Sequence, residues 1–127
     1  MIKVIIFMKK NEGLSRAELI DYYENSHVPL IMKHMGQYLL DYRRSFPDWD
    51  DPISFSGNFN FVEDMRPEPT FDVVTEMWIK DRVTMDEMFA VAGDPALAKV
   101  IEADAAQFRI QSSVRMCLTE EYGMSAS

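Results

Sequence analysis

The sequence of 127 residues is poor in the residue types that hold metals, disulfides and phosphate groups. It has one cysteine, Cys117, and two histidines, so it offers neither an internal disulfide nor a His/Cys cluster at zinc-ligand spacing. No glycine-rich phosphate loop follows a predicted strand. We therefore expect no metal site and no cofactor. A lone cysteine is typical of a protein from the reducing cytoplasm.

Long apolar runs and an excess of positive charge are also missing. The longest apolar run, Val4 to Met8, is far shorter than the roughly 20 residues of a membrane-spanning helix, and no secretory leader is visible. The 13 Lys and Arg residues against 21 Asp and Glu residues give a net charge of −8. That balance argues against nucleic-acid binding, which depends on clustered cations. We expect a cytoplasmic protein with no membrane or nucleic-acid partner.

What the sequence does have is a clear order of periodic segments within one domain, residues 1–118. Alternating apolar residues predict four strands, at Ile2–Lys10, Tyr38–Phe46, Thr70–Lys80 and Gln107–Leu118. Helical spacing predicts helices at Ser15–Ser26 and Thr84–Ala106, the second interrupted at Gly93-Asp94-Pro95. The order β-α-β-β-α-β predicts an α+β, ferredoxin-like fold with a four-stranded antiparallel sheet.

Two segments fall outside this pattern. The loop of residues 47–69 is long, yet it contains aromatic residues, which we expect to pack onto the rest of the protein. The polar tail of residues 119–127 is expected to fray.

The ends of the helices carry local signals. Ser15 and Glu18 have the spacing of a capping box, and Thr84 with Glu87 repeats it before the second helix. Pro29 disfavours a helical residue before it, so we expect the first helix to end near His27, with a short irregular turn over Leu30–Met35.

Two helices can cover only one face of a four-stranded sheet. The first and third strands nevertheless carry apolar residues on both faces, such as Phe7 and Trp78 on the face opposite Val73 and Met77. Apolar area left in water forgoes about 25 cal/mol per Å². A second copy of the sheet would cover the remaining face symmetrically, which predicts a homodimer.

The N-terminal region contains a short strand ending at Lys9, then Gly13-Leu14-Ser15, then Tyr22-Tyr23 followed by His27-Val28-Pro29-Leu30. These motifs resemble those of the EthD family. One difference is Tyr23, where the family often has Trp. The resemblance implies a ferredoxin-like domain that dimerises into an α/β barrel, and it says much less about activity.

If the helices cover the face of Val73, the opposite face lines the barrel. The residues expected to contact a small hydrophobic ligand there are Ile5, Phe7, Val74, Trp78 and Tyr42, with Lys3 and Lys9 at the two ends of the first strand. Ten methionines either fill the core or line an adaptable pocket.

Three residues are candidates for acid–base chemistry. His27 titrates near neutral pH, and a position at a helix C-terminus would favour its cationic form. We expect burial to favour the protonated form of Glu76, and Tyr23 is the candidate hydrogen-bond donor. The structural alternatives are that His27 anchors a helix end and that Glu76 pairs with a nearby Lys or Arg.

Three functions are compatible with these residues. The first is a cofactor-independent lyase, of decarboxylase or dehydratase type, or an isomerase, acting on an aromatic or polyketide-like molecule. This reading draws on the resemblance. The second is a non-catalytic binding or accessory protein of an oxidative degradation pathway, such as that of ethyl tert-butyl ether, from which the family is named. The third is a haem-handling barrel, with His27, His34, Cys117, a Met or a Tyr as axial ligand.

Overall fold

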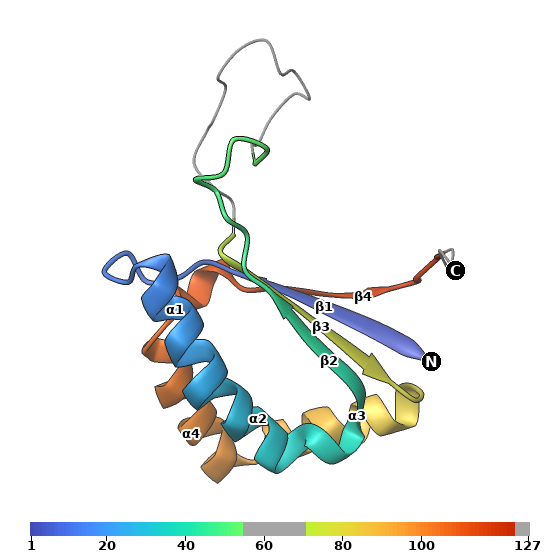
Figure 1. Cartoon of the computed structure of the whole chain (residues 1–127). Helices are drawn as coiled ribbons and strands as arrows, with labels where there is room; N and C mark the ends of the chain where they lie inside the picture. Colours follow the sequence, from blue (N-terminus) through green and yellow to red (C-terminus); the bar gives the residue numbers. More distant parts are fainter. Residues whose placement is uncertain (55–70, 124–127) are drawn as a thin grey trace.

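The computed structural model describes residues 1–54 and 71–123. Four strands form one sheet: β1 (Ile2–Met8), β2 (Leu39–Ser45), β3 (Val73–Ile79) and β4 (Arg115–Thr119). The strand order is β2-β3-β1-β4, and each neighbouring pair is antiparallel (Figure 1). The predicted α+β class and the ferredoxin-like element order are confirmed.

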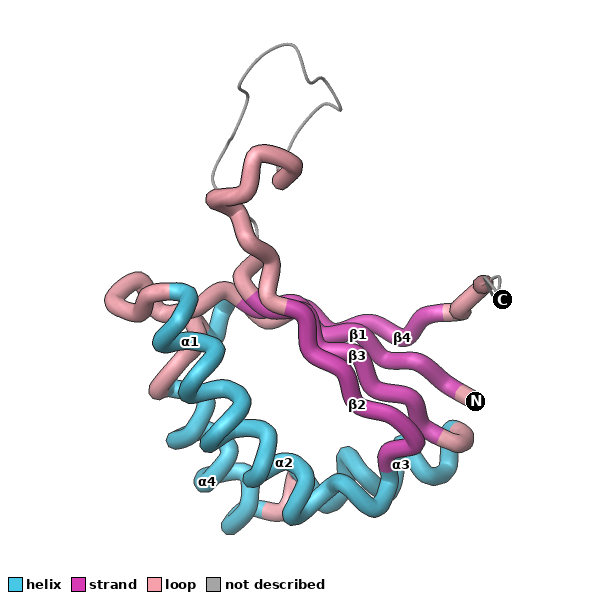
Figure 2. The backbone as a smooth tube through the Cα atoms, in the orientation of Figure 1, coloured by secondary structure: helices cyan, strands magenta, loops and turns pink. Residues whose placement is uncertain are grey.

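The helices all lie on one side of this sheet. They are α1 (Arg16–Tyr22), α2 (Val28–Met35), α3 (Arg82–Ala92) and α4 (Pro95–Ala106). Figure 2 shows them as a single layer against the strands, and no helix of the described residues covers the other side of the sheet. We call that uncovered side the open face.

The core lies between the helices and the sheet, in two clusters. The first joins residues of β1 and β3 to α2 and α3, and its buried members are Val4, Ile31, Met35, Met77, Ile79, Met85 and Met88. The second joins the other end of the sheet to α1 and α4, and its buried members are Met8, Leu19, Tyr23, Val73, Ala105 and Phe108. Five of these thirteen residues are methionines, so the core-filling interpretation of the methionine content accounts for half of the ten.

The first helix does not end at His27, and this prediction is wrong. A π-helical turn, η1 (Tyr23–His27), connects α1 directly to α2, and Val28 is helical with φ −59° and ψ −46°. The Val28 N–H donates to the Tyr23 carbonyl, five residues back, which shifts the hydrogen-bond register at the junction. Pro29 then falls in the first turn of α2, directly after the π turn that shifts the hydrogen-bond register and lets the helix accommodate a residue without an N–H. The predicted irregular turn at Leu30–Met35 is regular helix.

The expected cap of the second helical region also lies elsewhere. Ser15 and Glu18 do form the predicted capping box of α1, with Glu18 N–H donating to the Ser15 hydroxyl at 3.1 Å. At α3, however, the N-cap is Asp81 rather than Thr84. Its carboxylate accepts from both the N–H and the hydroxyl of Thr84, at 2.8 and 2.7 Å.

The last strand is shorter than predicted. Only Arg115–Thr119 forms β4, preceded by a 3₁₀ turn, η3 (Gln111–Ser113). Ser113 accounts for the difference, because its hydroxyl accepts from the Lys9 N–H at 2.9 Å and donates to the Ile110 carbonyl. These side-chain bonds replace part of the expected ladder between the first and last strands.

Part of the predicted loop and tail lies outside the described residues, namely 55–70 and 124–127. Within the described part of the loop, Trp49 donates from Nε1 to the Phe71 carbonyl at 2.8 Å and packs on the Phe71 ring. None of the helices in the described ranges combines the length and the apolar character needed to cross a bilayer.

Candidate functional site

The open face carries the alternate residues of β1 and β3 that the helices do not cover. The register places Ile5 opposite Glu76, Phe7 opposite Val74 and Lys3 opposite Trp78. Side chains alternate between the two faces of a strand, so these six point away from the helix layer. All six are only partly buried, whereas Val73, Thr75, Met77 and Ile79 on the other face are buried. The predicted assignment of the two faces of β3 is confirmed.

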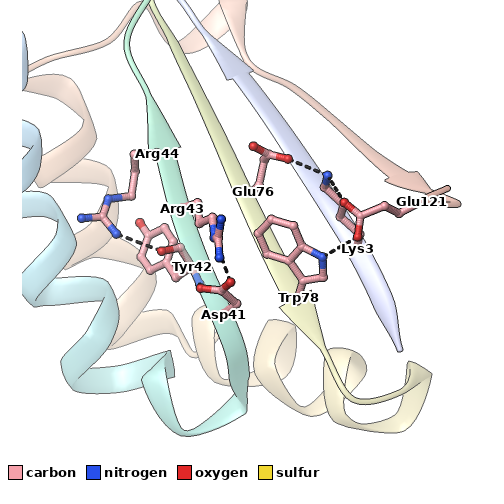
Figure 3. Close-up of polar contacts among 8 residues, drawn as sticks. All are labelled: Lys3, Asp41, Tyr42, Arg43, Arg44, Glu76, Trp78 and Glu121. Atoms are coloured by element: carbon pink, nitrogen blue, oxygen red, sulfur yellow. Dashed lines mark hydrogen bonds and ion pairs between the residues drawn. The ribbon is translucent and has the colours of Figure 1, made fainter. Parts of the chain in front are cut away.

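One end of the open face is a network of opposite charges. Lys3 Nζ lies 2.6 Å from Glu76 Oε2 and 2.7 Å from Glu121 Oε2, so one ammonium forms ion pairs with two carboxylates (Figure 3). Trp78 Nε1 donates to the other oxygen of Glu121 at 2.8 Å. The hydrogen bonds to Glu121 and then to Glu76 raise the pKa of Lys3. Glu76 therefore pairs with a nearby lysine, which is the structural alternative stated for it from the sequence.

Two cations flank the indole ring at this end. Lys3 Nζ lies 4.7 Å from the centre of the Trp78 ring, and the Arg43 guanidinium lies 5.6 Å from it. Arg43 also pairs with Asp41 at 2.9 Å. Every cation of this cluster thus has a carboxylate partner.

The other end of the open face is hollowed. A cavity of about 620 Å³ lies there, and we call it the cationic cavity; it is lined by Phe7, Lys9, Phe71, Ile110, Ser112, Ser113 and Arg115. The rings of Phe7 and Phe71 meet edge to face with centres 5.2 Å apart. The volume is in the range of small-molecule sites, and the lining combines aromatic rings with a few polar groups.

His27 lies on the opposite side of the sheet, in the helix layer. It is 6% exposed, and its Nδ1 lies 2.6 Å from Asp104 Oδ2 on α4. Its ring contacts those of Tyr23 and Phe108, with centres 4.6 and 4.9 Å away, and these two rings also contact each other. Burial lowers the pKa of His27, although the hydrogen bond to Asp104 acts in the opposite direction. Because the chain stays helical through His27, the expected helix-terminus stabilisation of its cationic form is absent.

Asp104 is the partner that the sequence reasoning missed. It also accepts from the Tyr22 hydroxyl at 2.9 Å, so one carboxylate joins two side chains of the first helical region to α4. Burial, with Asp104 adding to it, raises the pKa of Tyr22 to about 12. The available signal in the sequence was Asp104 itself, an acidic residue among mostly apolar residues near the end of α4.

Tyr23 and Tyr42 also belong to the helix side. Tyr23 is fully buried, and its hydroxyl hydrogen-bonds to that of Thr75 on β3. Tyr42 pairs with Met77 in the β2–β3 register, so it points toward the helices and not into the open face. The Tyr42 hydroxyl is buried and makes no hydrogen bond of normal geometry among the described residues, and burial, followed by the neighbouring Tyr23 hydroxyl, raises the pKa of Tyr42.

The predicted site residues therefore divide into two groups. Ile5, Phe7, Val74, Glu76 and Trp78 share the open face, whereas His27, Tyr23 and Tyr42 lie beneath the helices. The sheet itself separates His27 from Glu76, so a ligand on the open face meets Glu76 and does not meet His27. Within residues 1–54 and 71–123, no three His, Cys, Asp or Glu side chains gather as a metal site would require.

Comparison with known proteins gave one family and several similar structures. The family model of the EthD domain matches residues 11–109, which is most of the chain. A comparison with curated protein sequences found no significant match.

Among solved structures, three similar folds come from bacteria. An ethyl tert-butyl ether D (EthD) family protein from Bacillus halodurans has 20% identity and a TM-score of 0.60, over 96% of this chain and 99% of that one. HapK from Hahella chejuensis has 11% identity and a TM-score of 0.59, over 100% and 98%. A dimeric protein with a ferredoxin-like fold from Bacteroides fragilis has 11% identity and a TM-score of 0.55, over 94% and 95%. Likeness at these identities concerns the fold.

Proposed function

The chain belongs to the EthD family, and on that premise we propose that it acts as a homodimer that binds a small, mostly apolar molecule between two open faces. The observation that carries the proposal is the open face itself. Ile5, Phe7 and Val74 form an apolar strip that no helix covers, and the strip ends in a cavity of about 620 Å³.

A second copy of the chain is the occupant that fits this face best. Burying apolar side chains contributes about 25 cal/mol per Å², and the same strip on both partners makes the contact self-complementary. The similar Bacteroides fragilis protein is described as dimeric. Two curved sheets that face each other leave a central space, and the cavity described above would open into it.

A binding or accessory role agrees with the residues that line this space. Ile5, Phe7 and Val74 supply apolar contacts there, and Glu76, which lies beside them, is engaged by Lys3. The name of the family points to ethyl tert-butyl ether degradation, and an accessory role in an oxidative pathway of that kind is the finer form of the proposal.

Two measurements on the purified protein test the proposal. Light scattering at micromolar concentration should give twice the 14.7 kDa mass of one chain. Native mass spectrometry should then detect a dimer that retains an added apolar probe, 2-naphthol, without chemical change. A monomer that binds no probe would refute the proposal.

A second candidate, a cofactor-independent lyase or isomerase, is favoured by one observation. Glu76 lies beside the apolar strip, with Lys3 2.6 Å away to stabilise developing negative charge on a bound molecule. In that scheme Glu76 accepts a proton from the ligand, Ile5 and Trp78 hold the ligand, and His27 takes no chemical step. Conversion of a confirmed substrate by the wild type, lost in Glu76→Gln with binding intact, would support it; unchanged turnover in that variant would exclude Glu76.

A further inference from the structure

The two ends of the open face differ in whether their cationic side chains have carboxylate partners. At the Trp78 end, Lys3 lies between two carboxylates and Arg43 pairs with Asp41, so the cations are neutralised. At the other end, Lys9 and Arg115 line the cationic cavity. Among the described residues neither makes an ion pair, and no Asp or Glu side chain lines that cavity. This is notable in a chain with 21 acidic residues and a net charge of −8.

Asp72, the residue after Phe71 of the cavity lining, is already engaged elsewhere. Asp72 precedes β3 and accepts from the backbone N–H of Lys10 at 2.9 Å. It lines a different cavity, together with Ser15 and Trp49. Lys9 lines the cationic cavity, and no carboxylate of the described residues pairs with its ammonium.

Arg115 is held in place and still has donors to offer. Its Nη1 donates to the carbonyls of Ser112 and Val114, at 3.0 and 2.9 Å. A guanidinium has five N–H donors, so Nε and Nη2 stay available. An arginine whose guanidinium is held by the carbonyls of neighbouring residues is well suited to bidentate binding of a carboxylate.

The apolar half of the same cavity consists of the edge-to-face pair of Phe7 and Phe71, with Ile110 beside them. Such rings pack well on another aromatic ring. We infer that the cationic cavity selects an aromatic molecule that carries a carboxylate, with its ring on Phe7 and Phe71 and its carboxylate between Lys9 and Arg115. This inference rests on the proposed function, because it names the class of ligand for the open face.

Calorimetry with two probes of the same shape tests the charge selectivity. 2-Naphthoate carries a carboxylate, and 2-naphthamide replaces it with a neutral amide. We expect the wild-type protein to prefer naphthoate, and the Lys9→Met/Arg115→Met variant to bind it about tenfold or more weakly because two charge-assisted contacts are lost. Binding of naphthamide should change less than about twofold, and added salt should weaken naphthoate binding selectively.

Two further variants separate charge from structure. Lys99→Met removes the same charge from an exposed position on α4 away from the cationic cavity, and it should leave both probes unaffected. Lys9→Met alone should weaken naphthoate binding while keeping the Arg115 contacts with the turn, so a folding defect of the double variant would not hide the effect.

The outcomes also separate this inference from the proposed function. Equal affinity for both probes in the wild type and in Lys9→Met would overturn the charge selectivity while leaving an apolar site on the open face. If a dimer binds naphthamide and 2-naphthol but not naphthoate, the inference again fails alone. If neither naphthalene probe binds and the protein is monomeric, both fail.

Discussion

At the scale of single residues, His27 is a buried imidazole whose protonation opposes folding. Its folded-state pKa is lowered by burial from an ordinary value of 6.5, so the unfolded chain binds the proton more readily. Stability contributed by the neutral ring is therefore present above pH 6.5 and declines as the pH falls through that value toward the folded pKa.

This gives a prediction for the pH dependence of unfolding. Between pH 7 and pH 5 the wild-type free energy of unfolding should fall more than that of His27→Gln, which cannot titrate. Urea unfolding at a series of pH values measures the difference. Parallel pH profiles for wild type and His27→Gln would contradict the assigned direction.

Two buried tyrosines on the helix side give a matched pair of substitutions. Tyr23→Phe removes a hydroxyl bonded to that of Thr75 and strands the partner, which should cost about 1–2 kcal/mol in the free energy of unfolding. Tyr42→Phe removes a hydroxyl that makes no hydrogen bond of normal geometry among the described residues, so it should cost less stability than Tyr23→Phe.

Denaturant unfolding of the two variants and of Thr75→Val completes the comparison. The double variant Tyr23→Phe/Thr75→Val should lose less stability than the sum of its parts, because both groups of one hydrogen bond are then absent. Equal losses for Tyr23→Phe and Tyr42→Phe would mean that the Tyr23–Thr75 bond contributes no stability of its own.

At the scale of elements, the α3 cap can be tested by two neighbouring substitutions. Asp81→Ala removes the acceptor of two bonds, from the N–H and the hydroxyl of Thr84. Thr84→Val removes only one donor and keeps the branched shape. We expect Asp81→Ala to lower the melting temperature by a few degrees and Thr84→Val to lower it less, as followed by circular dichroism. If Thr84→Val lowers the melting temperature more than Asp81→Ala does, Thr84 is the more important residue for the start of this helix.

How far the sequence predicted the fold depends on the range of the interaction involved. Alternation in β1 and β3 was sufficient to assign which of Val73 and Val74 faces the helices, because the period of a strand is fixed by local geometry. Pro29 misled the prediction, since a π turn lets a helix continue through a residue that ordinarily ends one. The early end of the β1–β4 ladder depends on the Ser113 hydroxyl, which no periodicity encodes.

The candidate site shows the same limit. Alternation placed Lys3 and Lys9 at opposite ends of the open face, in agreement with the register of Lys3 and with the cavity that Lys9 lines. It could not show that Lys3 is neutralised by Glu121, 118 residues away, or that Arg115 joins Lys9 in one cavity. Nor could it show that His27 is buried against Asp104, 77 residues away in the sequence.

At the scale of the whole molecule, the proposed dimer depends on an apolar strip at the centre of the open face. Ile5→Lys places an ammonium there in each partner, and the twofold symmetry of a homodimer brings both into the same enclosed space. Burying unpaired charges is costly, so the variant should dissociate to the 14.7 kDa protomer at concentrations where the wild type is dimeric.

The control for this prediction lies on the far side of the helix layer. Val100 on α4 is 50% exposed, and Val100→Lys introduces the same charge without touching the open face. Light scattering should find this variant dimeric, and both variants should keep the wild-type circular dichroism because the substituted side chains are not part of the core. A dimeric Ile5→Lys protein would place the interface elsewhere, and the open faces would then have no partner to enclose a ligand.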